Sequence, residues 1–328
     1  GAVWRSDKTS QDGRNTRAPS PASSRTSGKG RRKTARRLAL LVGVSLLAGG
    51  GYLGWQELES SRWQSQWLSR YAADLDYTVK PGPSPRIQFP EDGPFDRRLG
   101  YVDLPNFIER LVQRNFRIEE QARFSRALLD YTSRGFFPPY PEESQAGLTI
   151  NDCRGLPLYT NSYPRQYYER FEDIPPLVVM SLLFIEDRGL LDASRPNANP
   201  AVDWPRFTKA AISQLEKRLG LGGQAAGGST LATQVEKYRH SPEGRTGDPQ
   251  EKIRQMVSAS VRTYREGPQT LATRQRIVRD YLNSVPLSAA PGHGEVHGIA
   301  DGLRLWFGAD FREVNRLLDP RSPEAVDQ

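Results

Sequence analysis

The sequence feature that most constrains the fold is an uncharged apolar run at residues 38–55, "LALLVGVSLLAGGGYLGW". About 18 residues without a charge are just enough to span the hydrocarbon core of a bilayer. The run follows "GRRKTARR", and Lys and Arg gather on the cytoplasmic side of membrane segments. We therefore predict one uncleaved transmembrane helix at 38–55. A cleaved signal peptide and a buried core helix are the alternatives.

The segment before this run, residues 1–37, is rich in Ser, Arg, Pro and Gly and has almost no large apolar residues. Such a composition cannot bury enough surface to fold, which predicts a disordered basic tail in the cytoplasm. The tail holds eleven Lys and Arg against two Asp, a net charge of +9, whereas the whole chain carries +8. The rest therefore sums to −1 and lacks the basic patch of a nucleic-acid binder, so no nucleic acid is expected as a partner.

Beyond the apolar run, hydrophobic periodicity and Pro/Gly positions predict three further regions. Residues 56–96 are expected to form a juxtamembrane helix and a linker. Residues 97–165 predict a small α/β neck module, with amphipathic helices at 104–116 and 118–135 and a strand–turn–strand at 147–159. Residues 166–328 are predicted to be all-α, with helices at 177–191, 203–219, 249–265, 271–283 and 298–308, and one that starts at Ser229 or Thr230.

Two adjacent carboxylates, Glu186 and Asp187, interrupt the apolar stretch "SLLFIEDRGLLD" at 181–192. Apolar segments accommodate acids when these are paired, protonated or used in chemistry. A partly desolvated carboxylate at the mouth of a cleft is suited to act as a general base. The alternative is a solvated helix end with a surface pair between Asp187 and Arg188.

A second polar segment, "AAGGSTLATQVEK" at 225–237, places two glycines before Ser229 and Thr230 and a helix bearing Gln234 and Lys237. Glycines let a ligand approach the backbone, and the N–H groups of a first helical turn attract anions. The lysine does not directly follow the glycines, which excludes a P-loop. An ordinary Gly-rich loop with a hydroxyl cap is the alternative. Two further segments are "EKIRQM" at 251–256 and "IVRDYLNSVPL" at 277–287.

In this order and spacing, the four segments resemble the peptidoglycan glycosyltransferases, the family 51 transglycosylase domains of class A penicillin-binding proteins. The resemblance covers roughly residues 174–310. The residues that match the four family motifs are, in turn, Glu186 and Asp187; Gly227, Gly228, Ser229, Thr230, Leu231, Gln234 and Lys237; Lys252; and Ile277, Tyr281, Leu282 and Asn283.

The resemblance implies a mainly α, lysozyme-like domain behind the transmembrane helix and the neck module. It implies a bacterial inner-membrane protein with a cytoplasmic N-terminus and a periplasmic or extracellular main domain. The implied activity is polymerisation of lipid II into glycan strands with inversion at the anomeric carbon, assisted by Mg²⁺ or another divalent cation that is not tightly bound. The implied catalytic residues are Glu186, as base, and Gln255; the implied substrate-binding residues are Asp187, Gly228, Ser229, Thr230, Gln234, Lys237, Lys252 and Asn283.

The chain departs from the family motifs at Ala193, Gln255 and Arg279, where the family has His, Glu and Glu. Glutamine cannot exchange a proton near neutral pH. A catalytically impaired protein that binds lipid II or glycan as a scaffold is therefore the alternative, and a lysozyme-like hydrolase is a third. The expected partners are lipid II, the nascent glycan strand, membrane lipid, and cell-wall synthesis proteins bound by the neck. We also expect the domain to continue beyond residue 328.

The three histidines lie outside these motifs. His293 and His297 flank Glu295 in "PGHGEVHG", and a His pair at this spacing can bind zinc when it lies on a helix. The glycines around them disfavour a helix, so we predict a Gly-rich cleft loop and no protein metal site. His240 is predicted to lie in a polar loop exposed to solvent.

Overall fold

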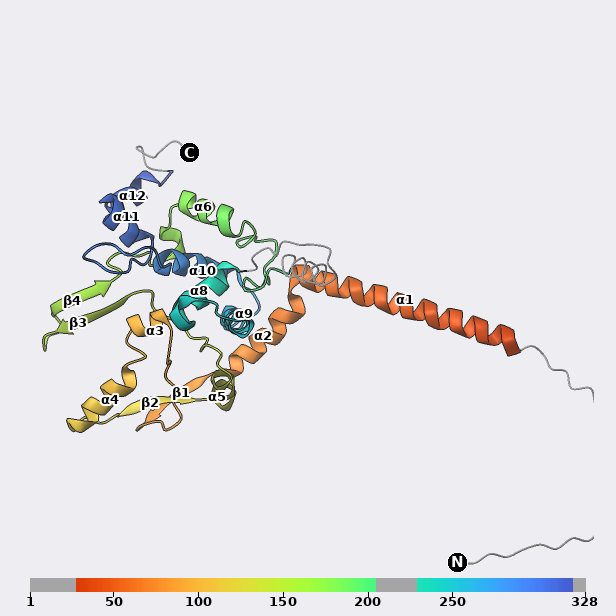
Figure 1. Ribbon diagram of the computed structural model, residues 1–328, viewed down its shortest axis with the longest axis horizontal. Helices are drawn as coiled ribbons and strands as arrows, with labels where there is room; N and C mark the ends of the chain where they lie inside the picture. The colour runs from red at the N-terminus through yellow and green to blue at the C-terminus, as the bar shows by residue number, and fades with distance from the viewer. Residues whose placement is uncertain (1–27, 205–228, 321–328) are drawn as a thin grey trace, which may run out of the picture. The chain divides into compact units, whose positions relative to one another are not determined.

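The computed structural model describes residues 28–204 and 229–320 (Figure 1). The chain divides into two compact units, Gly1–Leu53 and Gly54–Gln328. The described part is mainly helical, as predicted. Its α-helices are α1 Gly28–Ser60, α2 Arg62–Asp74, α3 Pro94–Arg98, α4 Leu104–Gln113, α5 Arg126–Ser133, α6 Pro176–Glu186, α8 Leu231–His240, α9 Pro249–Thr263, α10 Leu271–Ser284, α11 Ile299–Phe307 and α12 Phe311–Leu317. The 3₁₀ helices are η1 Phe171–Asp173 and η2 Pro242–Gly244, and the strands are β1 Tyr77–Pro81, β2 Glu120–Phe124, β3 Ala146–Asn151 and β4 Pro157–Tyr163.

Helix α1 contains the whole apolar run of residues 38–55 and extends beyond it on both sides, from the basic residues before it to Glu57 and Glu59. Leu46 and Leu47 on this helix are exposed. Within residues 28–204 and 229–320, no helix combines the length and the apolarity that crossing a bilayer requires. The transmembrane helix at 38–55 stays a prediction.

Helix α2 packs against α5 and α9 through a core of side chains that recur at helical spacing. The buried members of this core are Leu68, Ala72, Leu75, Leu128, Tyr131, Val261 and Tyr264. Arg265 donates from Nη1 to the carbonyl oxygens of Ala72 (2.6 Å) and Leu75 (2.7 Å) at the end of α2. The segment predicted as a juxtamembrane helix is thus a helix, and it lies on the same core as α9.

The predicted helix at 118–135 is wrong over its first half. Residues 120–124 form β2, which pairs antiparallel with β1 and places Tyr77 opposite Phe124. The helical part starts only at α5, where Ser125 accepts a hydrogen bond from the Leu128 N–H at 3.1 Å and caps the helix. The distant partner strand β1 decides the conformation of "EQARF", which is why local periodicity predicts it incorrectly.

The predicted strand–turn–strand is confirmed as the antiparallel hairpin β3–β4, which aligns Ala146 with Tyr163. Its turn is closed by Asp152, whose Oδ1 accepts from the backbone N–H groups of Arg154 (2.8 Å) and Leu156 (2.9 Å). These bonds form an Asx turn, which the "DCRG" sequence favours.

The second core joins α6, α8, α10, α11 and α12; α8 and α10 lie side by side near the middle of Figure 1. Its buried members are Tyr168, Ile174, Val179, Leu190, Leu231, Val278, Leu282, Ala300 and Phe311. Gly298 brings the loop after α10 back onto that helix. Its φ is +77°, and a Cβ there would lie 2.5 Å from the Asn283 carbonyl oxygen, so this position requires glycine.

Most of the predicted helix at 203–219 falls on residues 205–228, outside the described residues. The same holds for Gly227 and Gly228.

Candidate active site

Glu186 is the last residue of α6, and it is half-buried. The helix ends there because Asp187 has an extended backbone, with φ −161°. Gln234 on α8 donates from Nε2 to Glu186 Oε2 at 2.9 Å, and the Tyr238 hydroxyl donates to Gln234 Oε1 at 2.9 Å. The orientation of the Glu186 carboxylate is therefore fixed by two side chains of one helix.

Lys237 places a positive charge near this carboxylate, and Lys252 in turn interacts with Lys237. Burial lowers the pKa of Lys237, and the Glu186 carboxylate opposes that effect. Burial also lowers the pKa of Lys252, and repulsion from Lys237 lowers it further. Lys252 donates to the Ser229 hydroxyl at 2.7 Å, immediately before α8. These interactions run in sequence from Glu186 to Lys237, from Lys237 to Lys252, and from Lys252 to Ser229.

The start of α8 is formed as expected for a hydroxyl N-cap. Thr230 is the cap: its Oγ1 accepts from the Thr233 N–H at 3.3 Å, and its own N–H donates to Thr233 Oγ1 at 2.9 Å. Because the Thr230 side chain is buried and engaged in the cap, it positions α8, and Ser229 is the exposed hydroxyl. Gly228 lies outside the described residues.

Asp187 shapes the loop that follows Glu186. Its Oδ1 accepts from the Gly189 N–H at 3.1 Å. The Arg188 guanidinium lies 3.9 Å from the centre of the Phe184 ring, and its Nε donates to the Phe184 carbonyl oxygen at 3.3 Å. The arginine is thus held on the exposed side of α6.

Two predicted site residues lie in buried polar clusters of their own. Gln255 is 1% exposed and donates from Nε2 to Ser241 Oγ (3.0 Å) and Thr246 Oγ1 (3.1 Å). Asn283 is also buried and bonds twice to the backbone of Tyr168, accepting from its N–H and donating to its carbonyl oxygen, each at 2.8 Å. Among the described residues, these contacts show both side chains supporting the fold around the site.

Residues 155–317, about half of the chain, match the transglycosylase family. This stretch is a transglycosylase domain. The match confirms the resemblance at the level of the family and begins at the β3–β4 hairpin, earlier than the motifs alone indicate. No curated protein matches the sequence significantly.

A pair of tyrosines near Glu186, Tyr238 and Tyr281, was not predicted as part of the site. Their ring centroids are 6.2 Å apart, and burial raises the pKa of both hydroxyls. Tyr238 follows Gln234 by four residues, so both side chains lie on one face of α8. That four-residue spacing is the sequence signal that could have predicted the hydrogen bond between Tyr238 and Gln234.

The prediction that His240 is exposed to solvent is wrong. His240 is 6% exposed, and its ring lies between the carboxylates of Asp96 and Glu142. His297 Nε2 lies 3.3 Å from Glu295 Oε2 in the loop after α10. Within the described ranges, no group of three His, Cys, Asp or Glu side chains could hold a metal ion. Beside Glu186 the positive charge comes from lysines, so Mg²⁺ assistance stays a prediction.

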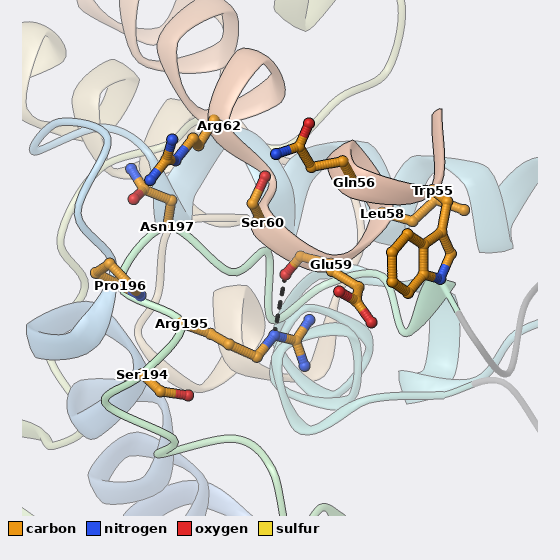
Figure 2. A pocket seen from close by; sticks show the side chains of 10 residues that line it. All are labelled: Trp55, Gln56, Leu58, Glu59, Ser60, Arg62, Ser194, Arg195, Pro196 and Asn197. Atoms are coloured by element: carbon orange, nitrogen blue, oxygen red, sulfur yellow. Dashed lines mark hydrogen bonds between the residues drawn. The ribbon is translucent and has the colours of Figure 1, made fainter. Parts of the chain in front are cut away.

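A cavity of about 690 Å³ lies between the end of α1 and the loop that follows Glu186 (Figure 2). Arg195 crosses it and donates from Nε to the Glu59 carbonyl oxygen at 3.2 Å, the dashed line in Figure 2. None of the predicted site residues lines this cavity. The lining residues are Trp55, Gln56, Leu58, Glu59, Ser60, Arg62, Ser194, Arg195, Pro196 and Asn197.

Proposed function

We propose that this transglycosylase domain polymerises lipid II into glycan strands, with inversion at the anomeric carbon. The observation that carries the proposal is the Glu186 carboxylate, which is held by Gln234 and interacts with Lys237, itself close enough to Lys252 for mutual repulsion. A base and two cations are what glycosyl transfer from a pyrophosphate donor needs.

Glu186 acts as the general base. Gln234 holds Oε2, so Oε1 takes the proton from the 4-hydroxyl of the acceptor sugar. The acceptor oxygen forms a bond to the anomeric carbon of the donor while the bond from that carbon to the phosphate oxygen breaks. The bonding electrons leave with polyprenyl pyrophosphate, and the proton passes from Glu186 to solvent. One displacement without a covalent enzyme intermediate inverts the anomeric carbon.

Lys237 and Lys252 stabilise the charge that develops on the leaving pyrophosphate. The two ammonium groups are half-buried and repel each other. An anion bound between them would reduce this repulsion and replace the water that burial removed. Ser229 orients Lys252 through their 2.7 Å hydrogen bond. This assignment needs no metal ion held by the protein.

Exposed apolar side chains beside Glu186 support a lipid-linked substrate at a membrane surface. Met180 and Ile185 on α6 are 63% and 77% exposed, and Phe184 is also exposed. Contiguous exposed apolar residues are characteristic of surfaces that meet lipid or protein partners. We therefore propose that the domain works at the outer face of the bacterial inner membrane, with α6 toward the lipid.

The alternative is a scaffold that binds lipid II or glycan without polymerising it. The observation that favours it is Gln255, a buried amide at the position of the second family carboxylate. Because a single displacement needs one base, the enzyme remains the proposal that the site supports best.

The test is incubation of the chain with labelled lipid II and Mg²⁺, with separation of the glycan products by size. Glu186→Gln should lower the polymerisation rate by about 10²–10⁴-fold, the range expected for loss of a general base. Glu172→Gln, a matched change at an exposed glutamate in η1, should leave the rate unchanged. Saturable lipid II binding without polymer would instead support the scaffold, and shortening of preformed glycan would support a hydrolase.

A further inference from the structure

A second cavity has a volume of about 890 Å³. Glu186 and the side chains that interact with it do not line this cavity. Its walls come from α3 and the loop before it, from the end of β4, from η2, and from the loop after α10. The residues that matter for its chemistry are Arg98, Tyr163, His293, Glu295 and His297. A cavity of this size accommodates a small organic molecule.

Arg98 forms no direct ion pair in the part of the chain that the structure describes, although Tyr163 and Glu295 favour its charge at longer range. Its guanidinium lies over the rings of Phe95 and Tyr163, 4.8 Å and 5.6 Å from their centres. Its Nε and Nη1 atoms are buried and make no hydrogen bond among the described residues. Burial lowers the pKa of Arg98, which shows that the charges nearby do not compensate its desolvation.

The acids of the cavity wall each have a basic partner of their own. Asp92 pairs with Arg97 at 3.6 Å, and Glu243 pairs with Arg245 at 4.0 Å. Glu295 lies 3.3 Å from His297 Nε2, and its carbonyl oxygen accepts from the Tyr163 hydroxyl. Glu295 thus faces both His297 and Arg98, and it compensates the Arg98 charge only in part.

The His293 ring adds a second unmatched polar group. It lies against Tyr163, with ring centroids 5.7 Å apart, and its buried Nε2 makes no hydrogen bond among the described residues. A buried polar atom without a hydrogen-bond partner loses the stabilisation that water gave it in the unfolded chain. An anion that reaches Arg98 and His293 with a small side-chain adjustment recovers this stabilisation.

We propose that this cavity binds a small oxyanion, a phosphate or the carboxylate of a small organic molecule, with Arg98 as its main contact and His293 as the second. The cation supplies charge-assisted hydrogen bonds. The Phe95 and Tyr163 rings that contact the Arg98 guanidinium reduce its exposure to water. Binding here is independent of glycan polymerisation, because none of these residues is Glu186 or a side chain that interacts with it.

The test is isothermal titration calorimetry of the full chain with three separate probes: inorganic phosphate, acetate and succinate. Saturable binding of phosphate alone identifies a phosphate site, and binding of acetate or succinate identifies a carboxylate site. Arg98→Gln should weaken binding of the active probe about tenfold or more. The control is Arg316→Gln, which removes the same charge from a residue of α12 that pairs with Glu313 and does not line the cavity. It should change the affinity less than about twofold.

Absence of saturable binding for all three probes overturns the proposal, as does equal affinity of Arg98→Gln and the unchanged protein. Circular dichroism verifies that the variant folds. If Arg98→Gln does not fold, Arg98→Lys replaces it, since lysine keeps the charge but not the planar guanidinium. Binding weakened about threefold or more in that variant supports Arg98 as the contact, and unchanged binding overturns it.

Discussion

Stability at alkaline pH should depend on a single buried histidine. His240, at the end of α8, lies between Asp96 Oδ2, 2.9 Å from its Nδ1, and Glu142 Oε1, 2.9 Å from its Nε2. Two further charges face the same ring: Glu236 Oε2 on α8 at 3.9 Å and Arg262 Nη2 on α9 at 3.5 Å. A second guanidinium, that of Arg239, pairs with Glu142 at 3.2 Å. Three carboxylates against two guanidinium groups favour the protonated form of the ring.

The magnitude follows from the shift in its pKa. Burial opposes the charge on the ring, but Glu142 and Asp96 outweigh burial and raise the pKa of His240 from 6.5 to about 9. Because the folded-state pKa is the higher one, the ring contributes its full stability below pH 6.5 and loses it as pH rises through 9. The difference between these pKa values corresponds to about 3 kcal/mol of unfolding free energy.

The assay is urea unfolding, followed by circular dichroism, of the unchanged protein and of His240→Gln between pH 6 and pH 9.5. Glutamine keeps a hydrogen-bond donor but cannot take up a proton. The unfolding free energy of the unchanged protein should fall by about 3 kcal/mol relative to the variant as pH rises from 6.5 to 9. A difference between the two proteins that stays constant over this range would refute the reasoning.

Three further changes probe the supporting residues. Asn283→Ala removes both bonds to the Tyr168 backbone and should lower the unfolding free energy by about 2–3 kcal/mol in urea titrations, with the KM for lipid II unchanged in the correctly folded fraction. Tyr238→Phe removes the hydroxyl that holds Gln234, so the polymerisation rate should fall about tenfold while thermal unfolding moves little; an unchanged rate contradicts it. Thr230→Ala removes the cap of α8 and should cost about 1 kcal/mol in the same unfolding assay.

Helices and turns whose conformation depends on neighbouring residues in the sequence are predicted well. The start of helix α6 is predicted because Pro176 begins an apolar run, but the predicted end at 191 is wrong, since the extended backbone of Asp187 ends the helix at Glu186. The β3–β4 hairpin is predicted because Asp152 favours its turn. Strand β2 is not predicted, since "EQARF" is extended by pairing with β1, far away in the chain. Long-range pairing overrides a local preference that is weak.

The candidate site divides in the same way. Gln234 and Lys237 are predicted to lie near Glu186 because a family pattern records which residues meet in space. His240 is not predicted to be buried, because its sequence neighbours are polar and the carboxylates that enclose it come from α3 and from the segment before β3. Burial of a charged residue depends on partners that no local pattern contains.

Gln255 shows what the family pattern alone leaves out. Its Nε2 donates to Ser241 Oγ and Thr246 Oγ1, and the Ser241 hydroxyl in turn donates to the carboxylate of Glu251. A carboxylate at position 255 would have no hydrogen to donate, and it would place a second buried negative charge beside Glu251. The neutral amide is the group that this cluster accommodates, so its presence reflects the packing of α9 rather than damage to the site. In the proposed mechanism, proton transfer then depends on Glu186, the half-buried carboxylate at the end of α6.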